Sequence, residues 1–215
     1  MSAVLACKLF PRTPPAFSRP AASYRKERAS LIFREVEDRD LILKAQRGSV
    51  DAYNLLVSRW EKRVFNYILK LVRNREDALD LCQDAFLKAY QNLKKLEDPA
   101  RFSGWLFRIA HNEAYSMLRR RKPEDDIDTA PVDIGPGGGG MLPVETALAV
   151  EAAMTRLSPE QREAVILKVY QGFKFEEMAE ILDCPLSTVK SRLYTAMDLL
   201  KTALAPTGVR NESNA

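Results

Sequence analysis

Residues 123–143 divide this chain in two, because no hydrophobic core can include them. Their sequence, PEDDIDTAPVDIGPGGGGMLP, holds five acidic residues, no basic residue and a run of four glycines. A stretch of this composition buries too little apolar surface to offset the entropy lost on ordering it. We therefore predict a flexible acidic linker over 123–143 that joins two small domains, one over 35–122 and one over 144–205.

Both predicted domains have the apolar periodicity of amphipathic helices, with no strand pattern. Before the linker, apolar residues recur at steps of three and four in three successive stripes. Asn74 stands where an N-cap would begin the second of these helices. After the linker, Ser158 and Gln161 have the spacing of a capping box, with Pro159 at the first helical position. The expected fold class is all-α, with two small helical domains.

The two ends of the chain, 1–34 and 206–215, are predicted to be disordered tails. Residues 1–34 carry seven basic residues, one acidic residue and four prolines, which prevent a stable helix. Their composition also fits an organelle transit peptide or a start codon assigned too far upstream. The sequence shows no secretory signal and no apolar run of about 18–20 residues. We expect a cytoplasmic protein without membrane insertion.

The side chains that build most catalytic and metal centres are scarce. The chain has one histidine, His111, and its three cysteines, Cys7, Cys82 and Cys184, lie far apart without a Cys-x-x-Cys pair. This argues against a zinc site, a histidine-ligated metal centre and a Ser-His-Asp triad. The nine glycines form neither common phosphate-binding loop. We therefore expect no cofactor, no metal and no enzymatic activity, which argues against a helical hydrolase or nuclease.

The pattern near the C-terminus predicts a helix-turn-helix. A short helix over about 175–182 precedes the turn 183–186, and Ser187 is placed to cap a last helix that runs to about 203. The second helix of such a motif enters the major groove of DNA. An ordinary helical hairpin with a solvated basic face has the same pattern, so both readings stay open on this evidence.

The last helix has an apolar side and a polar side. Its helical spacing predicts that the core face consists of Val189, Leu193, Met197 and Leu200. The exposed side would hold Thr188, Lys190, Ser191, Arg192, Tyr194 and Thr195. Lysine, arginine, serine and threonine at these positions can bond base edges or phosphates.

The first domain carries two polar surfaces of opposite charge. The acidic one, on the second helix, consists of Asp77, Asp80, Gln83 and Asp84, and suits a basic protein partner. The basic one, on the third helix, combines aromatic residues with arginines: Phe102, Trp105, Phe107, Arg108, Asn112, Arg119 and Arg120. Aromatic rings beside arginines suit unstacked single-stranded bases. In the alternative interpretation, both surfaces are ordinary solvated faces and Trp105 is a core residue.

Three segments together resemble the extracytoplasmic-function branch of bacterial RNA polymerase sigma factors. They are DALDLCQDAFLKAYQNL (77–93), GWLFRIAHNEAYSMLRRR (104–121) and LSPEQREAVILKVYQGFKFEEMAEILDCPLSTVKSRLYTAMDLL (157–200). The resemblance covers roughly residues 38–204. Each motif alone is moderately specific, and the ordered set with an acidic linker between its parts is far more so.

The resemblance implies a factor that gives promoter specificity to core RNA polymerase, which itself does the chemistry. Docking on the clamp helices of the largest polymerase subunit would use Asp80, Gln83 and Asp84. Capture of the melted −10 element, with a flipped base, would use the loop 97–104 and Phe102, Trp105, Arg108, Asn112, Arg119 and Arg120. Reading of the duplex −35 element would use Thr188, Lys190, Ser191, Arg192 and Tyr194. An anti-sigma protein would hold such a stress- or signal-responsive factor inactive.

This sequence departs from the family pattern at three positions. Ser116 stands where such factors commonly have aspartate, Thr195 where they have a basic residue, and Leu186 where they have a small one. These changes leave the promoter sequence open. The alternative function is a stand-alone helix-turn-helix repressor that binds duplex DNA as a dimer. The acidic face and the segment 102–112 argue against it, because a repressor needs neither.

Overall fold

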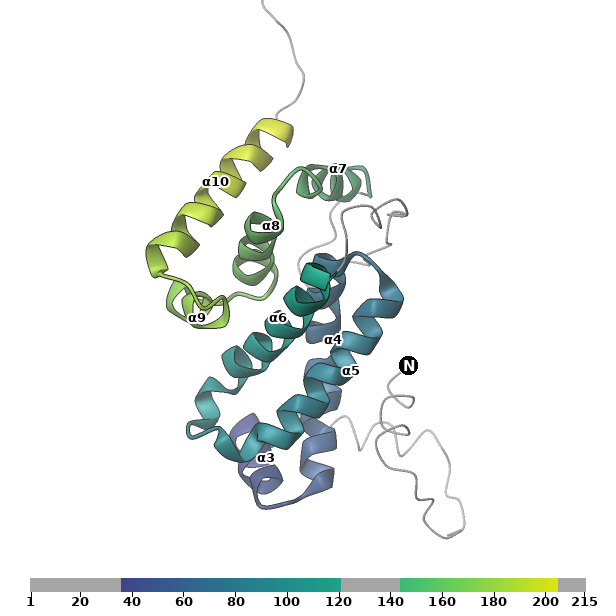
Figure 1. The fold of residues 1–215 in the computed structure, drawn as a ribbon, viewed down its shortest axis with the longest axis vertical. Coiled ribbons are helices and arrows are strands. Elements are labelled where there is room, and N and C mark those ends of the chain that lie inside the picture. Colours follow the sequence, from purple (N-terminus) through teal and green to yellow (C-terminus); the bar gives the residue numbers. More distant parts are fainter. Residues whose placement is uncertain (1–35, 121–143, 205–215) are drawn as a thin grey trace, which may run out of the picture. The chain divides into compact units, whose positions relative to one another are not determined.

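The computed structural model describes residues 36–120 and 144–204, and every regular element in these ranges is a helix (Figure 1). The expected all-α fold is therefore confirmed. Contacts between residues separate the chain into two compact units, which we call the first unit (36–120) and the second unit (144–204). The predicted tails over 1–34 and 206–215 and the predicted linker over 123–143 lie outside the described residues.

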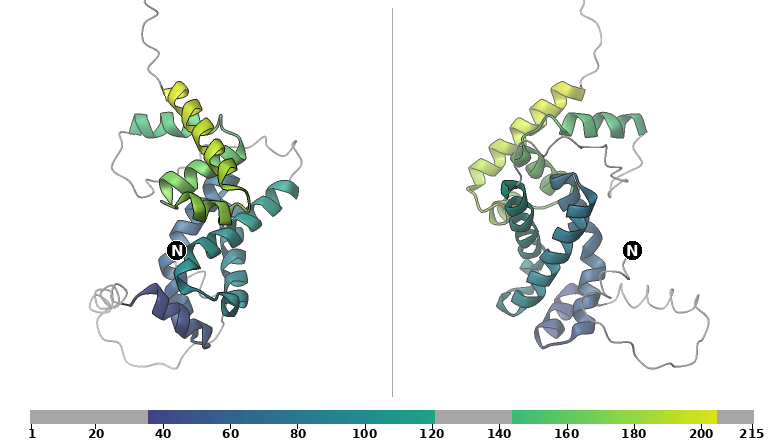
Figure 2. Two further views of the ribbon diagram at one scale, coloured as in Figure 1. Left: turned by 90° about the vertical axis from the view of Figure 1, so that its left-hand side faces the viewer. Right: turned by 45° about the vertical axis from the view of Figure 1, so that its right-hand side comes forward.

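The first unit is a helical bundle. Its elements are α3 (Asp38–Gln46), α4 (Val50–Val72), α5 (Arg75–Asn92), the 3-10 helices η1 (Leu93–Lys95) and η2 (Pro99–Arg101), and α6 (Phe102–Arg120). The long helices α4, α5 and α6 pack side by side (Figure 1, Figure 2). The short α3 packs against α4 and against both 3-10 helices. The connection between α5 and α6 is therefore supported from α3.

The apolar stripes of these helices meet in one core. Leu56, Ile68, Phe86, Leu106 and Ala110 are at most 1% exposed. Burying a large apolar side chain of this kind contributes about 1.5–3 kcal/mol. The core holds α5 and α6 in a fixed relation, which positions the polar side chains on their outer faces.

The boundary between α4 and α5 follows from local chemistry. Arg73 ends α4 in a left-handed conformation with φ 57°. The side-chain oxygen of Asn74 then accepts hydrogen bonds from the backbone N–H groups of Glu76 at 2.9 Å and Asp77 at 3.1 Å. This N-cap satisfies two donors that the helix itself leaves without partners. The predicted cap at Asn74 is confirmed.

The second unit is also helical. Its elements are α7 (Val144–Met154), α8 (Pro159–Val165), the π-helical turn η4 (Ile166–Tyr170), α9 (Phe175–Ile181) and α10 (Leu186–Leu204). The α10 helix packs on α7, α8 and α9. Ser158 and Gln161 exchange hydrogen bonds of 3.1 and 3.2 Å at the start of α8, so the predicted capping box is confirmed.

Two sequence predictions for α10 were wrong. The helix begins at Leu186 rather than after Ser187, because the N–H groups of Thr188 and Val189 already donate to the carbonyl oxygen of Pro185. Met197 is 44% exposed, not buried. The core position belongs instead to Ala196, which is fully buried. A rotation of about 100° separates these neighbours on the helix, so only one of them can face the core, and that one is the smaller Ala196.

Candidate nucleic-acid interface

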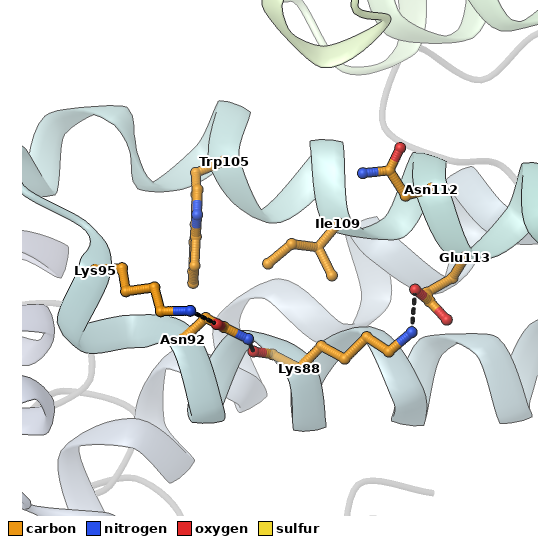
Figure 3. Close-up of a pocket in the computed structure, with 7 residues that line it drawn as sticks. All are labelled: Lys88, Asn92, Lys95, Trp105, Ile109, Asn112 and Glu113. Atoms are coloured by element: carbon orange, nitrogen blue, oxygen red, sulfur yellow. Dashed lines mark hydrogen bonds and ion pairs between the residues drawn. The ribbon is translucent and has the colours of Figure 1, made fainter.

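A pocket of about 270 Å³ opens between α5 and α6 (Figure 3). One wall comes from the end of α5 and from η1, and the other comes from α6. The residues that line it are Lys88, Asn92, Lys95, Trp105, Ile109, Asn112 and Glu113. Two ammonium groups and one carboxylate give the pocket a net positive charge, which suits a nucleic-acid ligand.

A chain of polar contacts runs along the α5 wall of the pocket (Figure 3). The Lys95 ammonium donates to the Asn92 side-chain oxygen at 2.8 Å, and the Asn92 amide donates to the Lys88 carbonyl oxygen at 2.9 Å. The Lys88 ammonium then forms a 2.5 Å ion pair with Glu113 on α6. These contacts join the side chains of the wall to one another and to α6.

Trp105 and Ile109 supply an aromatic ring and an aliphatic group to the α6 wall. Trp105 is half-buried, and its ring centroid lies 6.1 Å from that of Phe102. Asn112 is exposed at the rim. The side chain of Trp105 is therefore shared between the packing of α6 and the surface of the pocket.

The basic residues predicted for this face are spread along α6. Arg108 is exposed but does not line the pocket. Arg119 and Arg120 are exposed in the last turn, where Arg120 donates to the Ser116 hydroxyl at 3.0 Å. The structure thus brings Trp105 and Asn112 into one pocket, and the three arginines lie exposed on α6 outside it.

Phe102, which the sequence analysis named as a candidate contact for the −10 element, is buried. Its side chain is only 2% exposed. It lies in edge contact with Trp60 at 5.9 Å, and so it has no free face for a base. At the first residue of α6, Phe102 packs between the rings of Trp60 and Trp105.

The loop before α6 is held by a residue that the sequence analysis did not single out. The side-chain amide of Gln46, at the end of α3, donates to the carbonyl oxygens of Leu93 at 3.0 Å and Leu96 at 2.7 Å. Asp98 caps the following turn by accepting from the N–H of Ala100 at 2.9 Å. The loop therefore has a defined conformation beside the pocket.

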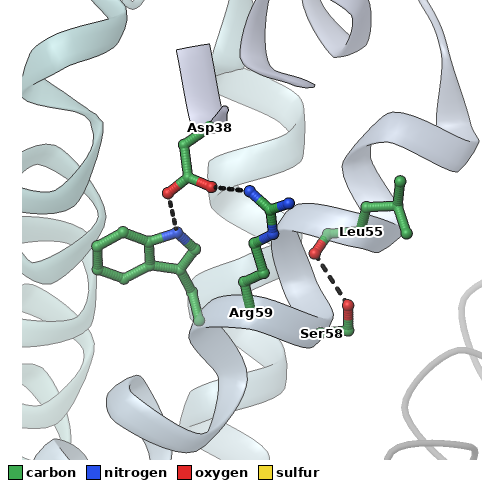
Figure 4. A network of polar contacts seen from close by, with 5 residues as sticks. Asp38, Leu55, Ser58 and Arg59 are labelled. Carbon is green, nitrogen blue, oxygen red and sulfur yellow. Dashed lines mark hydrogen bonds and ion pairs between the residues drawn. The ribbon is translucent and has the colours of Figure 1, made fainter. Parts of the chain in front are cut away.

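A second polar network ties α3 to α4 (Figure 4). The Asp38 carboxylate accepts from Arg59 at 2.6 Å and from the indole N–H of Trp60 at 2.9 Å. Arg63 stacks over the Trp60 ring at 4.7 Å, and burial lowers the pKa of its guanidinium, a shift that Asp38 opposes. Because Trp60 also contacts Phe102, this network supports the start of α6.

The acidic residues of α5 lie toward solvent. Asp80 and Asp84 are exposed and Gln83 is half-buried. Behind them Cys82 is buried, and this burial raises the pKa of its thiol to about 12, with the charge of Glu61 adding to the shift. The polar and apolar sides of α5 therefore follow the sequence prediction.

On α10, three of the residues predicted to face DNA are well exposed. These are Lys190, Ser191 and Tyr194, whereas Thr188 and Arg192 are half-buried. Arg192 lies across the turn and donates to the Cys184 sulfur at 3.8 Å. The Ser191 hydroxyl donates to the carbonyl oxygen of Thr188 at 3.0 Å, which leaves its oxygen to accept.

An aromatic ring beside these residues was missed by the sequence analysis. Phe175, at the start of α9, is half-buried and lies 6.4 Å from the Tyr194 ring. The ammonium groups of Lys168 and Lys190 lie 4.7 and 5.7 Å from its centroid. Phe175 therefore joins η4, α9 and α10 at the exposed end of the helix-turn-helix.

The sequence analysis missed five of the pocket residues: Lys88, Asn92, Lys95, Ile109 and Glu113. A detectable spacing joins all the lining residues, which are 88, 92 and 95 on α5 and η1, and 105, 109, 112 and 113 on α6. Each set falls on one helical face.

The described residues contain no group of three or more histidine, cysteine or acidic side chains able to hold a metal ion. No described helix combines the length and apolar character needed to cross a membrane.

Comparison with known protein families gives the two units a common identity. The model of sigma-70 region 2 matches residues 56–124, and the model of sigma-70 region 4 matches residues 147–200. Among curated relatives, the RNA polymerase sigma-H factor of Pseudomonas aeruginosa is 32% identical over 183 residues, which cover 79% of this chain and 95% of the relative. The ECF RNA polymerase sigma-E factor of Haemophilus influenzae is 32% identical, with 80% and 97% covered.

The chain belongs to the sigma-70 family of RNA polymerase sigma factors, in its extracytoplasmic-function branch. It is a promoter-recognising transcription initiation factor. The comparisons give no support to the repressor alternative.

Two solved structures share its fold. The sigma factor RpoE of Bartonella quintana, solved in complex with the anti-sigma factor NepR, is 30% identical, has a TM-score of 0.62 and covers 74% of this chain and 100% of its own. CnrH in complex with the cytosolic domain of CnrY is 26% identical, has a TM-score of 0.60 and covers 80% and 99%.

Proposed function

We propose that the first unit captures the melted −10 element of a promoter and that the second unit reads the duplex −35 element. In this arrangement the chain selects the promoter in the cytoplasm and core RNA polymerase performs the chemistry, so the chain is not itself an enzyme. The predicted domains, 35–122 and 144–205, would each carry one DNA-binding surface.

The pocket between α5 and α6 is the single observation that carries this proposal. It combines a half-buried indole with amide and charged side chains around a space of about 270 Å³, which can admit a base. Stacking of an unpaired base on an aromatic ring contributes about 1–3 kcal/mol. Arg108, Arg119 and Arg120 are exposed around it and can contact the phosphates of the same strand.

The −35 surface is proposed from the exposed face of α10. Lys190, Ser191 and Tyr194 lie on the first turns of a helix that forms the second part of a helix-turn-helix. Those turns enter the major groove most deeply in proteins of this architecture. Thr188 and Arg192 are less exposed, and we assign them to the edge of the contact.

Docking on the polymerase is proposed for the acidic side of α5. Asp80 and Asp84 project into solvent, and the half-buried Gln83 lies between them in the sequence. An acidic face suits a basic surface on the clamp helices. The structures similar to this chain include complexes with an anti-sigma factor, which supports our proposal that an anti-sigma protein also binds this chain.

The proposal is tested with the full chain, core RNA polymerase and forked DNA that presents a single-stranded −10 segment. Trp105→Ala should weaken holoenzyme binding to forked DNA about tenfold while leaving core affinity unchanged. The control is Leu148→Ala, because Leu148 is 63% exposed in the other unit. Equal binding by the Trp105→Ala and Leu148→Ala variants would remove the pocket from the promoter contact. Tight binding of duplex DNA without core polymerase would favour the repressor class instead.

A further inference from the structure

Glu113 places a carboxylate against the wall of the pocket, where few acidic groups are expected in a DNA-binding surface. Its side chain is 15% exposed, whereas that of its partner Lys88 is 51% exposed. The ion pair uses the oxygen Oε1 of Glu113. The other oxygen, Oε2, has no hydrogen-bond partner among the residues that the structure describes, so it is free to accept a proton donor from a ligand.

We propose that this pocket selects an unstacked base that carries an exocyclic amine, which donates to Glu113 Oε2, and that it rejects thymine. The inference rests on the proposed function of the first unit, the capture of melted −10 DNA. It adds the chemistry that distinguishes one base from another at that site.

The selection follows from the edges of the four bases. Adenine, cytosine and guanine each carry an exocyclic amine, and a glutamate accepts well from such a group. Thymine has none. Its ring N–H is flanked by two carbonyl oxygens, so a carboxylate that approached this donor would also meet an acceptor. In a partly buried site this mismatch costs more than it would in water, because fewer water molecules can compensate.

The other pocket residues hold the base without distinguishing its edge. Trp105 can stack on any of the four bases, since each has a π-face. Asn112 forms no hydrogen bond with the other described residues, and its amide both donates and accepts, so it can pair with the edge of any of the four bases and does not exclude thymine. The side chain of Asn92 already accepts a hydrogen bond from Lys95 and donates one to the Lys88 carbonyl oxygen. Discrimination therefore falls on Glu113.

Lys88 would fix the direction of Glu113 rather than read the base. Its ammonium binds one carboxylate oxygen and leaves the other toward the ligand. The volume of about 270 Å³ lies just below the roughly 300–1,000 Å³ of pockets for drug-sized ligands, so a single base, which is smaller than such ligands, can enter. The alternative is a purely structural ion pair between α5 and α6 with no contact to DNA.

The experiment uses holoenzyme, formed from the full chain and core RNA polymerase, and forked DNA with a randomised single-stranded −10 segment. Bound DNA is sequenced. With the unaltered chain, one position should show thymine depleted about tenfold relative to the amine-bearing bases. Glu113→Gln should reduce this depletion to about twofold, because a glutamine amide also donates to a thymine carbonyl. Glu37→Gln is the matched control, since Glu37 is exposed in the same unit, and it should keep the tenfold depletion.

Lys88→Gln separates base contact from a structural role. It breaks the ion pair that orients Glu113 but keeps the carboxylate, so the thymine depletion should fall less than it does in Glu113→Gln. Equal loss of depletion in Lys88→Gln and Glu113→Gln would overturn the inference, and so would identical base profiles for Glu113→Gln and the unaltered chain. In both cases, weaker binding of forked DNA by the Trp105→Ala variant would still support the proposed function of the first unit. If the unaltered chain selects no base and Trp105→Ala binds normally, the proposed function itself fails.

Discussion

The ammonium group of Lys190 lies 5.7 Å from the centroid of the Phe175 ring, which links the first residue of α9 to the exposed face of α10. The ammonium group of Lys168 lies 4.7 Å from the same ring. Cations within about 6 Å of an aromatic centroid are attracted to its face. Phe175 therefore restricts the directions that Lys190 can take before DNA is bound.

Lys190→Ala should relax the base preference at one position of the −35 element. If Lys190 contacts a base edge, its loss costs about 1–3 kcal/mol at that position and little at others. The measurement is holoenzyme affinity for a set of −35 variants at several salt concentrations. A uniform loss across all sequences, with a salt slope lower by about one, would instead identify a phosphate contact.

Phe175→Leu should weaken −35 binding about threefold, because removing the ring removes a cation–π contact of about 0.5–1 kcal/mol. Phe175→Tyr keeps the ring and should bind normally. In a Lys190→Ala background, Phe175→Leu should have no further effect on affinity, since the two residues act through one contact. Additive losses in this double-mutant cycle would show that Phe175 contributes to folding or to DNA independently of Lys190.

Asp80→Arg and Asp84→Arg should each weaken binding to core RNA polymerase by about tenfold, a loss of about 1.4 kcal/mol. Both side chains are exposed, so the thermal unfolding of the chain should change little. Affinity is measured by competition for core enzyme. Asp198→Arg, at an exposed position of α10, is the matched charge reversal and should bind core normally. Unchanged affinity in both α5 variants would exclude this face from docking.

Gln46→Ala should loosen the loop between η1 and α6. The change removes two hydrogen bonds and leaves the carbonyl oxygens of Leu93 and Leu96 without this donor, at a cost of about 1–3 kcal/mol in the free energy of unfolding. Urea denaturation measures the free energy of unfolding, and holoenzyme affinity for forked DNA measures the effect on −10 binding. Gln91→Ala, at an exposed position of α5, should alter neither quantity. The assigned role of Gln46 is contradicted if the two variants unfold alike.

The stability of the first unit should fall as the pH rises above about 9. Burial raises the pKa of the Cys82 thiol from an ordinary value of 9.0 to about 12. The unfolded thiol therefore loses its proton between pH 9 and pH 12 while the folded thiol keeps it. In this window stability falls by up to about 1.4 kcal/mol per pH unit. Urea unfolding at pH 9 and pH 10 should show a shallower fall for Cys82→Ala. A slope equal to that of the unaltered chain would contradict this account.

Several features were predictable because their causes are local in the sequence. The caps at Asn74 and Ser158 depend on a side chain and on N–H groups two or three residues away. The division of α5 into an acidic side and a buried side depends on helical periodicity alone. At Ala196 and Met197, helical periodicity allows either of the two adjacent residues to face the core, and so it did not predict which one is buried.

The sequence by itself determined the helical stretches on either side of the acidic segment, the caps at Asn74 and Ser158, and the family. Each of these rests on contacts within a turn or on motifs that can be read in order. Only the tertiary structure decided that Phe102 is buried, that Gln46 holds the loop before α6, and that Lys88 meets Glu113 across a pocket. These relations depend on how far each helix is rotated and shifted along its neighbour. That offset is set by the packing of whole side chains in the core, and no spacing within a single helix contains it.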